Sequence, residues 1–297
     1  MALRDFALMV LICLIWASNN IVSKFVVSHM GVAPLFYAAV RFAIVAVAVG
    51  RWLLPIPRPL WRLVTVALLM GGGNFALLFI GLQTASPSSV AIVSQLGVPM
   101  TAVMGWFMLG ERLNGRRALG VALTLAGVLL VMWDPRGLQT SFGLLYIVAA
   151  TVLGSLGAVM MKQMPGVKPL QFQAWVGFAS MFPLFALSFI LEPGAWRGAV
   201  HAGQPFVAAV LFSALIVSVS AHTAYYGLIQ RYEATLVAPL TLMTPLGTIA
   251  LGVMITHDSF GPRMALGTAI ALAGVLVIAL RPNQIMGLLL ALRPRSQ

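Results

Sequence analysis

Long apolar runs recur along the whole sequence and limit the possible fold more than any other feature. We count ten, at residues 5–23, 34–54, 63–83, 87–109, 117–133, 142–162, 170–191, 205–229, 234–256 and 263–281. Each has about the 17 to 25 residues that an α-helix needs to cross a hydrocarbon core of about 30 Å. The runs are continuously apolar, whereas the strands of a membrane barrel alternate over about ten residues. The sequence therefore predicts an all-α integral membrane protein with ten transmembrane helices.

Composition excludes a soluble domain. Hydrophobic residues make up 61% of the chain and charged residues 8%, whereas about 25% of the residues of a soluble domain are charged. The formal net charge of +12 comes without any basic run interleaved with aromatic residues, so nucleic acid is not expected as a partner. The partners that we expect are the lipid bilayer and a small-molecule substrate, and the oligomeric state stays open, with a monomer as one possibility.

The first apolar run and the basic residues predict how the chain sits in the membrane. Arg4 precedes an apolar run without an Ala-x-Ala site, so we expect a retained first helix rather than a cleaved signal peptide. Thirteen Lys and Arg residues fall on the side that holds the N-terminus and four on the other. Because basic residues favour cytoplasmic loops, both termini are expected in the cytoplasm, with the chain in a bacterial inner membrane.

The sequence also contains an internal duplication. The offset that separates Pro99 from Pro245 also separates Gly81 from Gly227, and the motif Leu-Ala-Gly-Val-Leu occurs at residues 125–129 and 272–276. Five helices are an odd number, so the second copy enters the membrane with opposite polarity and the pair forms an inverted repeat. We expect a first repeat at 1–133, a linker at 134–141, an inverted second repeat at 142–281 and a short cytoplasmic or interfacial tail at 282–297.

Several of these features together resemble a known family. They are the stretch Trp16-Ala-Ser-Asn-Asn20 with Lys24, the pair Arg41-Phe42, the prolines of the fourth and ninth helices, the turn Gly110-Glu-Arg112 and the repeated Leu-Ala-Gly-Val-Leu. The chain resembles the drug/metabolite transporter superfamily, and its five-helix unit is similar to EamA-type bacterial exporters, including the YddG-like exporters of amino acids. The resemblance implies a cavity between the halves and alternating access. The second half departs from it, with His257-Asp258 in place of Gly110-Glu111-Arg112 and Val176 roughly where Arg41 would recur.

Polar residues inside the membrane are the candidates for a substrate site, because an unpaired polar group in hydrocarbon is costly. Helical spacing places several of them on common faces of single helices. The candidates are Trp16, Asn19, Asn20, Tyr37, Arg41, Asn74, Leu78, Ser94, Gln95, Trp175, His222, Tyr225 and Tyr226. Asn19 and Asn20 could instead bond neighbouring helices, and Trp175 could belong to an interfacial aromatic belt.

Two kinds of residue point to a mechanism. Arg41 could bind a substrate carboxylate through its guanidinium fork, or it could be a structural partner for backbone carbonyls. Proline removes a backbone hydrogen bond, so Pro99, Pro239 and Pro245 are expected to act as hinges in the fourth and ninth helices.

The acidic residues limit the coupling mechanism. All six are expected at termini or in loops, so no carboxylate within the membrane offers a Na⁺ site or a proton relay. Facilitated transport, or weak proton coupling through His222, is expected instead. We expect no metal site and no cofactor, and the sequence lacks the phosphate-binding motif of a nucleotide hydrolase.

The sequence thus predicts an exporter of small organic metabolites, with neutral or aromatic amino acids as the preferred class. A carrier of nucleotide sugars or of other metabolites and drugs in the same superfamily is the alternative. A carrier of phosphorylated substrates would need several basic residues in the cavity, and only Arg41 lies clearly within a predicted span. An intramembrane enzyme built on Ser218 and His222 is disfavoured because no orienting carboxylate accompanies the pair. A structural membrane protein is disfavoured as well, because such a protein does not need two inverted halves with helices that can bend.

Overall fold

The computed structural model describes the chain except residues 111–113, 134–137, 165, 233–236, 238–239 and 280–297. Every regular element among the described residues is a helix. Nine helical segments in the described part of the chain are long and apolar enough to cross a membrane, and Met243–Ile255 is a shorter apolar helix. The prediction of an all-α, multi-pass membrane fold is confirmed. Most described span ends lie within a few residues of the predicted ones, but the first span, predicted to end at residue 23, continues to His29. The first part of the predicted ninth span and the predicted tail fall largely outside the described residues.

The first five spans occupy residues 3–132. Span one is α1 (Leu3–Lys24) continued by the π-helix η1 (Phe25–His29), and span two is α2 (Pro34–Val49) with the short η2 (Gly50–Leu53). Span three consists of α3 (Leu60–Ala67), the π-helix η3 (Leu68–Gly73) and α4 (Asn74–Thr84). Span four consists of α5 (Pro87–Val93), the 3₁₀ turn η4 (Ser94–Leu96) and α6 (Gly97–Leu109), and span five is α7 (Gly115–Met132).

The remaining spans begin with α8 (Leu138–Lys162) and α9 (Pro169–Leu191). Span eight is α11 (Gln204–Leu211), the π-helix η5 (Phe212–Ala221) and α12 (His222–Arg231). The last two described helices are α14 (Met243–Ile255) and α15 (Pro262–Ala279). A short helix that the apolar pattern does not predict, α10 (Trp196–Ala202), lies between α9 and α11. Its Trp196 and Val200 side chains are exposed, so it lacks the buried face that would have revealed it.

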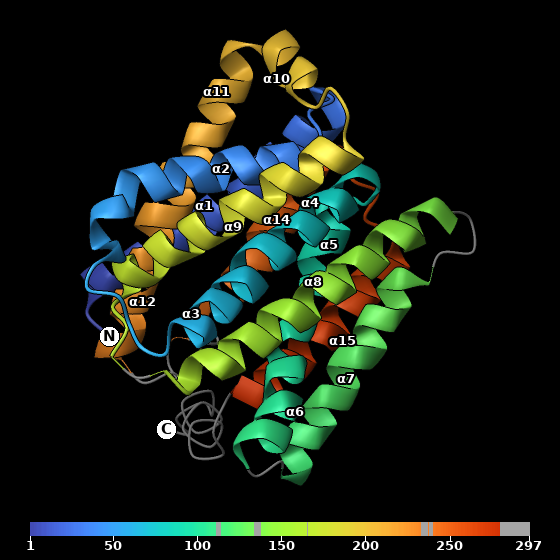
Figure 1. The fold of residues 1–297 in the computed structure, drawn as a ribbon. Coiled ribbons are helices and arrows are strands. Elements are labelled where there is room, and N and C mark those ends of the chain that lie inside the picture. Colours follow the sequence, from blue (N-terminus) through green and yellow to red (C-terminus); the bar gives the residue numbers. More distant parts are fainter. Residues whose placement is uncertain (111–113, 134–137, 165, 233–236, 238–239, 280–297) are drawn as a thin grey trace, which may run out of the picture.

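The helices pack in pairs that are distant in the sequence. In Figure 1, α7 and α15 lie side by side at one edge of the bundle, and α2 lies against α9. Between these pairs, α4 packs against α8 and α1 packs against α14. The centre of the bundle therefore lies between α1, α4, α8 and the helices that contact them.

The repeated Leu-Ala-Gly-Val-Leu motif marks the place where α7 and α15 cross. A Cβ atom on Gly127 would lie 2.6 Å from the carbonyl oxygen of Gly267, and one on Gly274 would lie 2.7 Å from that of Gly120. Each glycine thus lets the backbone of the opposite helix approach closely, which is how small residues promote helix contacts in membranes. Each of the two crossing helices therefore supplies one copy of the repeated motif.

Candidate functional site

A cavity of about 650 Å³ lies at the centre of the bundle. Its volume is within the range of small-molecule sites, about 300–1,000 Å³. The helices α1, α2, α4, α6, α8, α12 and α14, together with η4 and η5, contribute side chains to its wall. The sequence-predicted residues in this wall are Trp16, Asn19, Asn20, Arg41, Asn74, Leu78, Ser94, His222 and Tyr225.

One wall of the cavity is aromatic. The Trp16 ring lies 5.2 Å from the His222 ring and 5.0 Å, edge to face, from the Tyr225 ring. The Nδ1 atom of His222 lies 2.7 Å from the carbonyl oxygen of Val217, which can only accept, so Nδ1 carries the hydrogen. The indole Nε1 of Trp16 is buried and has no hydrogen-bond partner among the described residues. An indole N–H can only donate, and the burial of this nitrogen means that a ligand acceptor reaches it only after a movement of the wall.

Arg41 supplies the positive charge at this wall. Its side chain has no solvent-exposed surface. The guanidinium donates from Nε and Nη2 to Ser218 Oγ, at 3.2 and 3.0 Å, and lies 4.4 Å from the centre of the Phe75 ring. Nη1 is buried and has no hydrogen-bond partner among the described residues. It is thus the guanidinium nitrogen with a bond left to donate, and an anion in the cavity reaches it only after a neighbouring side chain moves.

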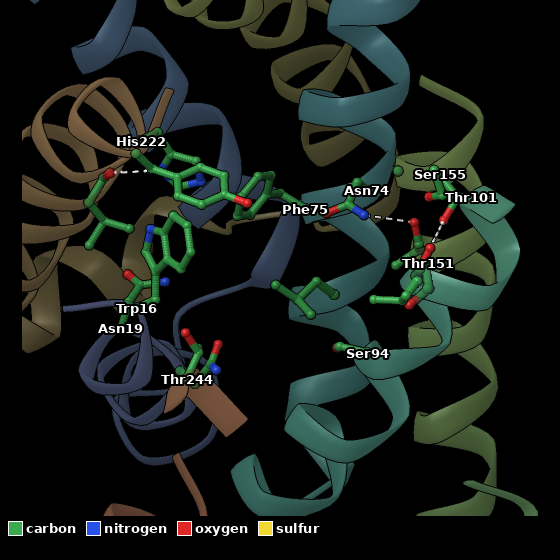
Figure 2. A pocket seen from close by; sticks show the side chains of 18 of the residues that line it. Trp16, Asn19, Asn74, Phe75, Ser94, Thr101, Thr151, Ser155, His222 and Thr244 are labelled. Carbon is green, nitrogen blue, oxygen red and sulfur yellow. Dashed lines mark hydrogen bonds between the residues drawn. The ribbon is translucent and has the colours of Figure 1, made fainter. Parts of the chain in front are cut away.

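The opposite wall is lined with small hydroxyl and amide groups. Figure 2 shows Asn74, Thr101, Thr151 and Ser155 across the cavity from Trp16 and His222, with Phe75 between the two groups. Asn74 donates from Nδ2 to the carbonyl oxygen of Ala150, at 2.7 Å, and Thr151 donates to the carbonyl oxygen of Ile147. These bonds hold the groups in place while their oxygens remain available as acceptors.

Irregular helix geometry coincides with the cavity. The π-helix η3 ends directly before Asn74, the π-helix η5 ends directly before His222, and the 3₁₀ turn η4 begins at Ser94. Short π segments within α-helices are frequent at functional sites. At η3, Gly72 donates its backbone N–H to Ser180 Oγ at 2.8 Å, and the lack of a Cβ on Gly71 leaves room for that side chain. Gly71 and Gly72 thus allow α9 to approach the π turn, whereas a Cβ on Gly73 would meet Leu153 of α8.

Three of the predicted site residues do not line the cavity. Tyr37 is fully buried, and its hydroxyl lies 2.6 Å from Ser213 Oγ and 3.3 Å from Ser23 Oγ. Gln95 donates to the carbonyl oxygen of Ala91, and Trp175 donates from Nε1 to the carbonyl oxygen of Leu53 at 3.3 Å. All three are bonded to protein groups instead. The side chain of Tyr226 lies outside the described residues.

Two of the predicted hinge prolines occupy equivalent places. Pro99 is the third residue of α6 and Pro245 is the third residue of α14. Residues 241–242 before α14 form a turn, as η4 does before α6. A proline in the first turn of a helix removes no intrahelical bond, so the break in each span precedes the proline. Pro239 lies outside the described residues.

Several cavity residues were missed by sequence reasoning. They are Phe75, Gly97, Val98, Thr101, Ala150, Thr151, Gly154, Ser155, Val217 and Thr244. A pattern was present for some of them, because Ser94, Val98 and Thr101 follow helical spacing, and Thr151 and Ser155 are one turn apart. Isolated Ser and Thr residues are common in membrane helices, so this pattern alone would not have singled them out.

Comparison with known proteins identifies the family. The model of the EamA-like transporter family matches residues 5–133 and 141–280. The chain belongs to the EamA-like transporter family. It is therefore a membrane transporter rather than an enzyme, in agreement with the sequence-based expectation. The structure also weakens the case for a Ser218–His222 catalytic pair, because Ser218 Oγ donates to the carbonyl oxygen of Ser213 and His222 bonds Val217.

Relatives of this EamA-like transporter include named efflux proteins. The chain is 26% identical over 288 residues to an Escherichia coli protein named "Probable amino-acid metabolite efflux pump", covering 93% of this chain and 95% of that protein. It is 25% identical over 291 residues to a Salmonella typhimurium protein of the same name, with the same two coverages. A solved crystal structure superposes with a TM-score of 0.64 at 21% identity, covering 93% of this chain and 97% of that one. That likeness concerns the fold alone.

Charged side chains tie helix ends together where α1, α4 and α14 end. Lys24 Nζ donates to the carbonyl oxygens of Leu82, Gln83 and Ala85, at 2.8, 3.2 and 3.0 Å. Asp258, which follows α14, accepts from the backbone nitrogen of Ser88 at 2.9 Å and from Ser88 Oγ. The corner between α4 and α5 is thus held from two sides in this EamA-like transporter, by a cation on α1 and an anion after α14.

Proposed function

We propose that this protein exports small organic metabolites from the bacterial cytoplasm by alternating access, with neutral or aromatic amino acids as the preferred class. The observation that carries the proposal is the central cavity, in which a buried guanidinium with a free Nη1 lies near aromatic rings. A guanidinium fork matches a carboxylate, and Trp16 and Tyr225 offer apolar surface with a polar edge to a side chain. The names of the two efflux relatives agree with this class.

The division into two inverted five-helix repeats, 1–133 and 142–281, belongs to the same proposal. The pairs of helices that are in contact support this division. If the first five spans are exchanged with the last five, the pairs α2 with α9 and α7 with α15 map onto themselves. The contact of α4 with α8 maps onto that of η5 with α1, and the contact of α6 with α8 maps onto that of α14 with α1. A pseudo-twofold axis in the membrane plane gives this pattern.

In the proposed cycle the two halves rock about the cavity. Spans four and nine bend at the breaks before Pro99 and Pro245, while Arg41 holds the substrate carboxylate. Both termini face the cytoplasm, as the distribution of basic residues indicates. The described residues of the cavity wall include no carboxylate. We therefore propose a facilitator, or weak proton coupling through His222.

A carrier of nucleotide sugars or phosphorylated sugars is less well supported. Phosphate groups call for several cations in the cavity. Among the described residues of its wall, Arg41 is the one basic residue other than His222. Lys24 is engaged by three backbone carbonyls.

Uptake by proteoliposomes tests the proposal. Labelled phenylalanine, tryptophan, threonine, a nucleotide sugar and a cationic dye are supplied with and without an imposed pH gradient. We expect saturable amino-acid flux without the gradient. Flux of the sugar or the dye alone would contradict the substrate class, and flux that needs the gradient would contradict the facilitator mechanism.

A second experiment tests the contact between Asp258 and α5 as a closure of the cavity. Asp258→Ala leaves the N–H of Ser88 without its charged acceptor, a bond worth about 1.5–3 kcal/mol. In a Cys13→Ala background, a cysteine introduced at Thr101 on the cavity wall reports access. We expect an impermeant maleimide added from the extracellular side to label it about fivefold faster or more, as the lost bond energy allows.

Asp5→Ala is the matched control for this experiment. Asp5 also accepts a hydrogen bond, from the Tyr232 hydroxyl at 2.6 Å, but it lies in the first turn of α1, at the opposite end of that helix from Lys24. Its loss should leave extracellular labelling unchanged. Equal labelling rates in Asp258→Ala and in the parent protein would show that this contact does not close the cavity.

A further inference from the structure

We propose that the cavity selects monoanionic carboxylates whose nitrogen is acylated or absent, in preference to zwitterionic free amino acids. The inference rests on the proposed function and adds a ranking to it, in which a zwitterionic amino acid is bound less tightly than an anionic carboxylate with the same side chain. It follows from the balance of charge and of hydrogen-bond donors in the described part of the cavity wall. The recognised ligand has one carboxylate and no ammonium group, and an amide carbonyl can supply an additional acceptor.

Arg41 is a buried cation without an anionic partner among the described residues. Its contacts are the Ser218 hydroxyl and the faces of Phe75 and Phe79, at 4.4 and 5.8 Å from the ring centres. An arginine side chain remains charged in proteins, and a buried charge without a counter-charge is costly. A ligand that brings a single negative charge removes this cost.

The described carboxylates are engaged elsewhere. Asp258 binds Ser88, Asp5 binds Tyr232, and Glu192 accepts from the backbone nitrogens of Leu35 and Phe36 at the start of α2. None of the three is part of the cavity wall. A substrate ammonium group would therefore find no carboxylate among the described residues that form the cavity.

The position of an ammonium group follows from that of the carboxylate. In a free amino acid the two groups are attached to the same carbon. When the carboxylate binds at Nη1, the ammonium group must stay close to the guanidinium, where two positive charges repel each other in a medium of low dielectric constant. Stacking on an aromatic face offers little relief near Arg41, because Phe75 is already occupied by the guanidinium.

The free hydrogen-bonding groups agree with this reading. Three buried polar atoms in the described part of the wall have no hydrogen-bond partner: Thr244 Oγ1 can donate or accept, whereas the two nitrogens, Trp16 Nε1 and Arg41 Nη1, can only donate. The two nitrogens call for acceptors on the ligand, and an ammonium group brings none. An N-acyl group replaces the ammonium by a neutral amide, whose carbonyl oxygen can accept from Trp16 and whose N–H can donate to the hydroxyl groups of Thr151 or Ser155 on the opposite wall.

Four compounds with the same benzyl side chain test the inference on the wild-type protein. They are phenylalanine, N-acetylphenylalanine, 3-phenylpropionate and phenylalaninamide, which at neutral pH are a zwitterion, two anions and a cation. Their affinities are measured by titration calorimetry on purified protein, and their flux is followed in proteoliposomes. We expect both anions to bind about tenfold more tightly than phenylalanine, a difference of about 1.4 kcal/mol, and the cation to bind most weakly.

Phenylalanine binding as tightly as the better of the two anions would overturn the inference while leaving the proposed function intact. Failure of all four compounds to bind or move, with the protein monodisperse, would instead contradict the proposed amino-acid class itself. The two failures are therefore distinguishable.

Two variants of the contact between Arg41 and Phe75 show whether the preference for anions depends on the charge or on the packing. Arg41→Gln removes the charge and should reduce the preference for anions to within about threefold. Phe75→Leu removes the ring that covers the guanidinium but keeps the charge, so the preference for anions should persist. A preference that survives Arg41→Gln in a folded protein would also overturn the inference.

Discussion

Replacing Arg41 with lysine is expected to reduce saturable uptake about tenfold or more, although the positive charge is kept. Nε and Nη2 of Arg41 together hold Ser218 Oγ, while Nη1 is buried and has no partner among the described residues. A lysine ammonium is a compact point charge that cannot hold Ser218, stack on Phe75 and present a planar fork at the same time. Losing one charge-assisted hydrogen bond to the substrate costs about 1.5–3 kcal/mol. Initial rates in proteoliposomes over a range of substrate concentrations measure the effect.

Arg51→Lys is the matched control for this substitution. Arg51 also lies over an aromatic ring, 3.7 Å from the centre of Trp52, but it is exposed at the end of span two and takes no part in the cavity wall. Uptake by this variant should equal that of the parent protein. Wild-type uptake by Arg41→Lys would refute the role of the guanidinium fork and leave Arg41 a structural residue.

Placing leucine at Gly127 or at Gly274 is expected to cause the largest loss of stability. A Cβ at either position meets backbone atoms of the opposite helix, which cannot rotate away as the end of a side chain can. Overpacking a well-filled contact costs about 1–3 kcal/mol, and a contact with backbone belongs at the upper end of that range. We expect the apparent melting temperature in detergent to fall by about 5 °C or more.

Gly115→Leu controls for the loss of glycine in α7. Gly115 is the first residue of that helix, and a Cβ there would meet nothing within 4 Å. The double variant Gly127→Leu/Gly274→Leu adds a further test. The two glycines belong to one helix crossing, so once the first leucine has forced α7 and α15 apart, the second should cost less than it does alone. Melting temperatures unchanged in both single variants would show that the crossing is not tightly packed.

The helical fold could be predicted from the sequence because the bilayer imposes a simple rule. Backbone groups in hydrocarbon must bond within their own segment, so each apolar run of sufficient length becomes a span. The interruptions within spans could not be predicted in the same way. The π-helix over residues 212–221 has no proline or glycine and holds three serines, Ser213, Ser218 and Ser220. The Ser218 and Ser220 hydroxyls donate to the carbonyl oxygens five residues back, those of Ser213 and Leu215, and the sequence pattern alone does not indicate this pairing.

Part of the site could be predicted from the sequence, because helical spacing shows which residues share a face of a single helix. Trp16, Asn19 and Asn20 follow helical spacing and lie together in the cavity wall. Tyr37 and Arg41 also share a face of α2, but only Arg41 reaches the cavity. The Tyr37 hydroxyl bonds Ser213 on η5 and Ser23 on α1. Spacing within one helix shows which residues share a face, but not which neighbouring helix covers that face.

The π-helix before His222 has a consequence for the movement of span eight. A π turn holds more residues than an α turn, so a segment that relaxes to α geometry shifts the register of the helix beyond it by about one residue, or about 100°. If the residues before η5 stay in place, such a shift would move His222 to where Thr223 lies now and bring Ala221 to the present place of His222 in the cavity wall. A second register of span eight would thus place a methyl group instead of an imidazole at the cavity, and would lengthen the span by about 1.5 Å, the rise of one residue.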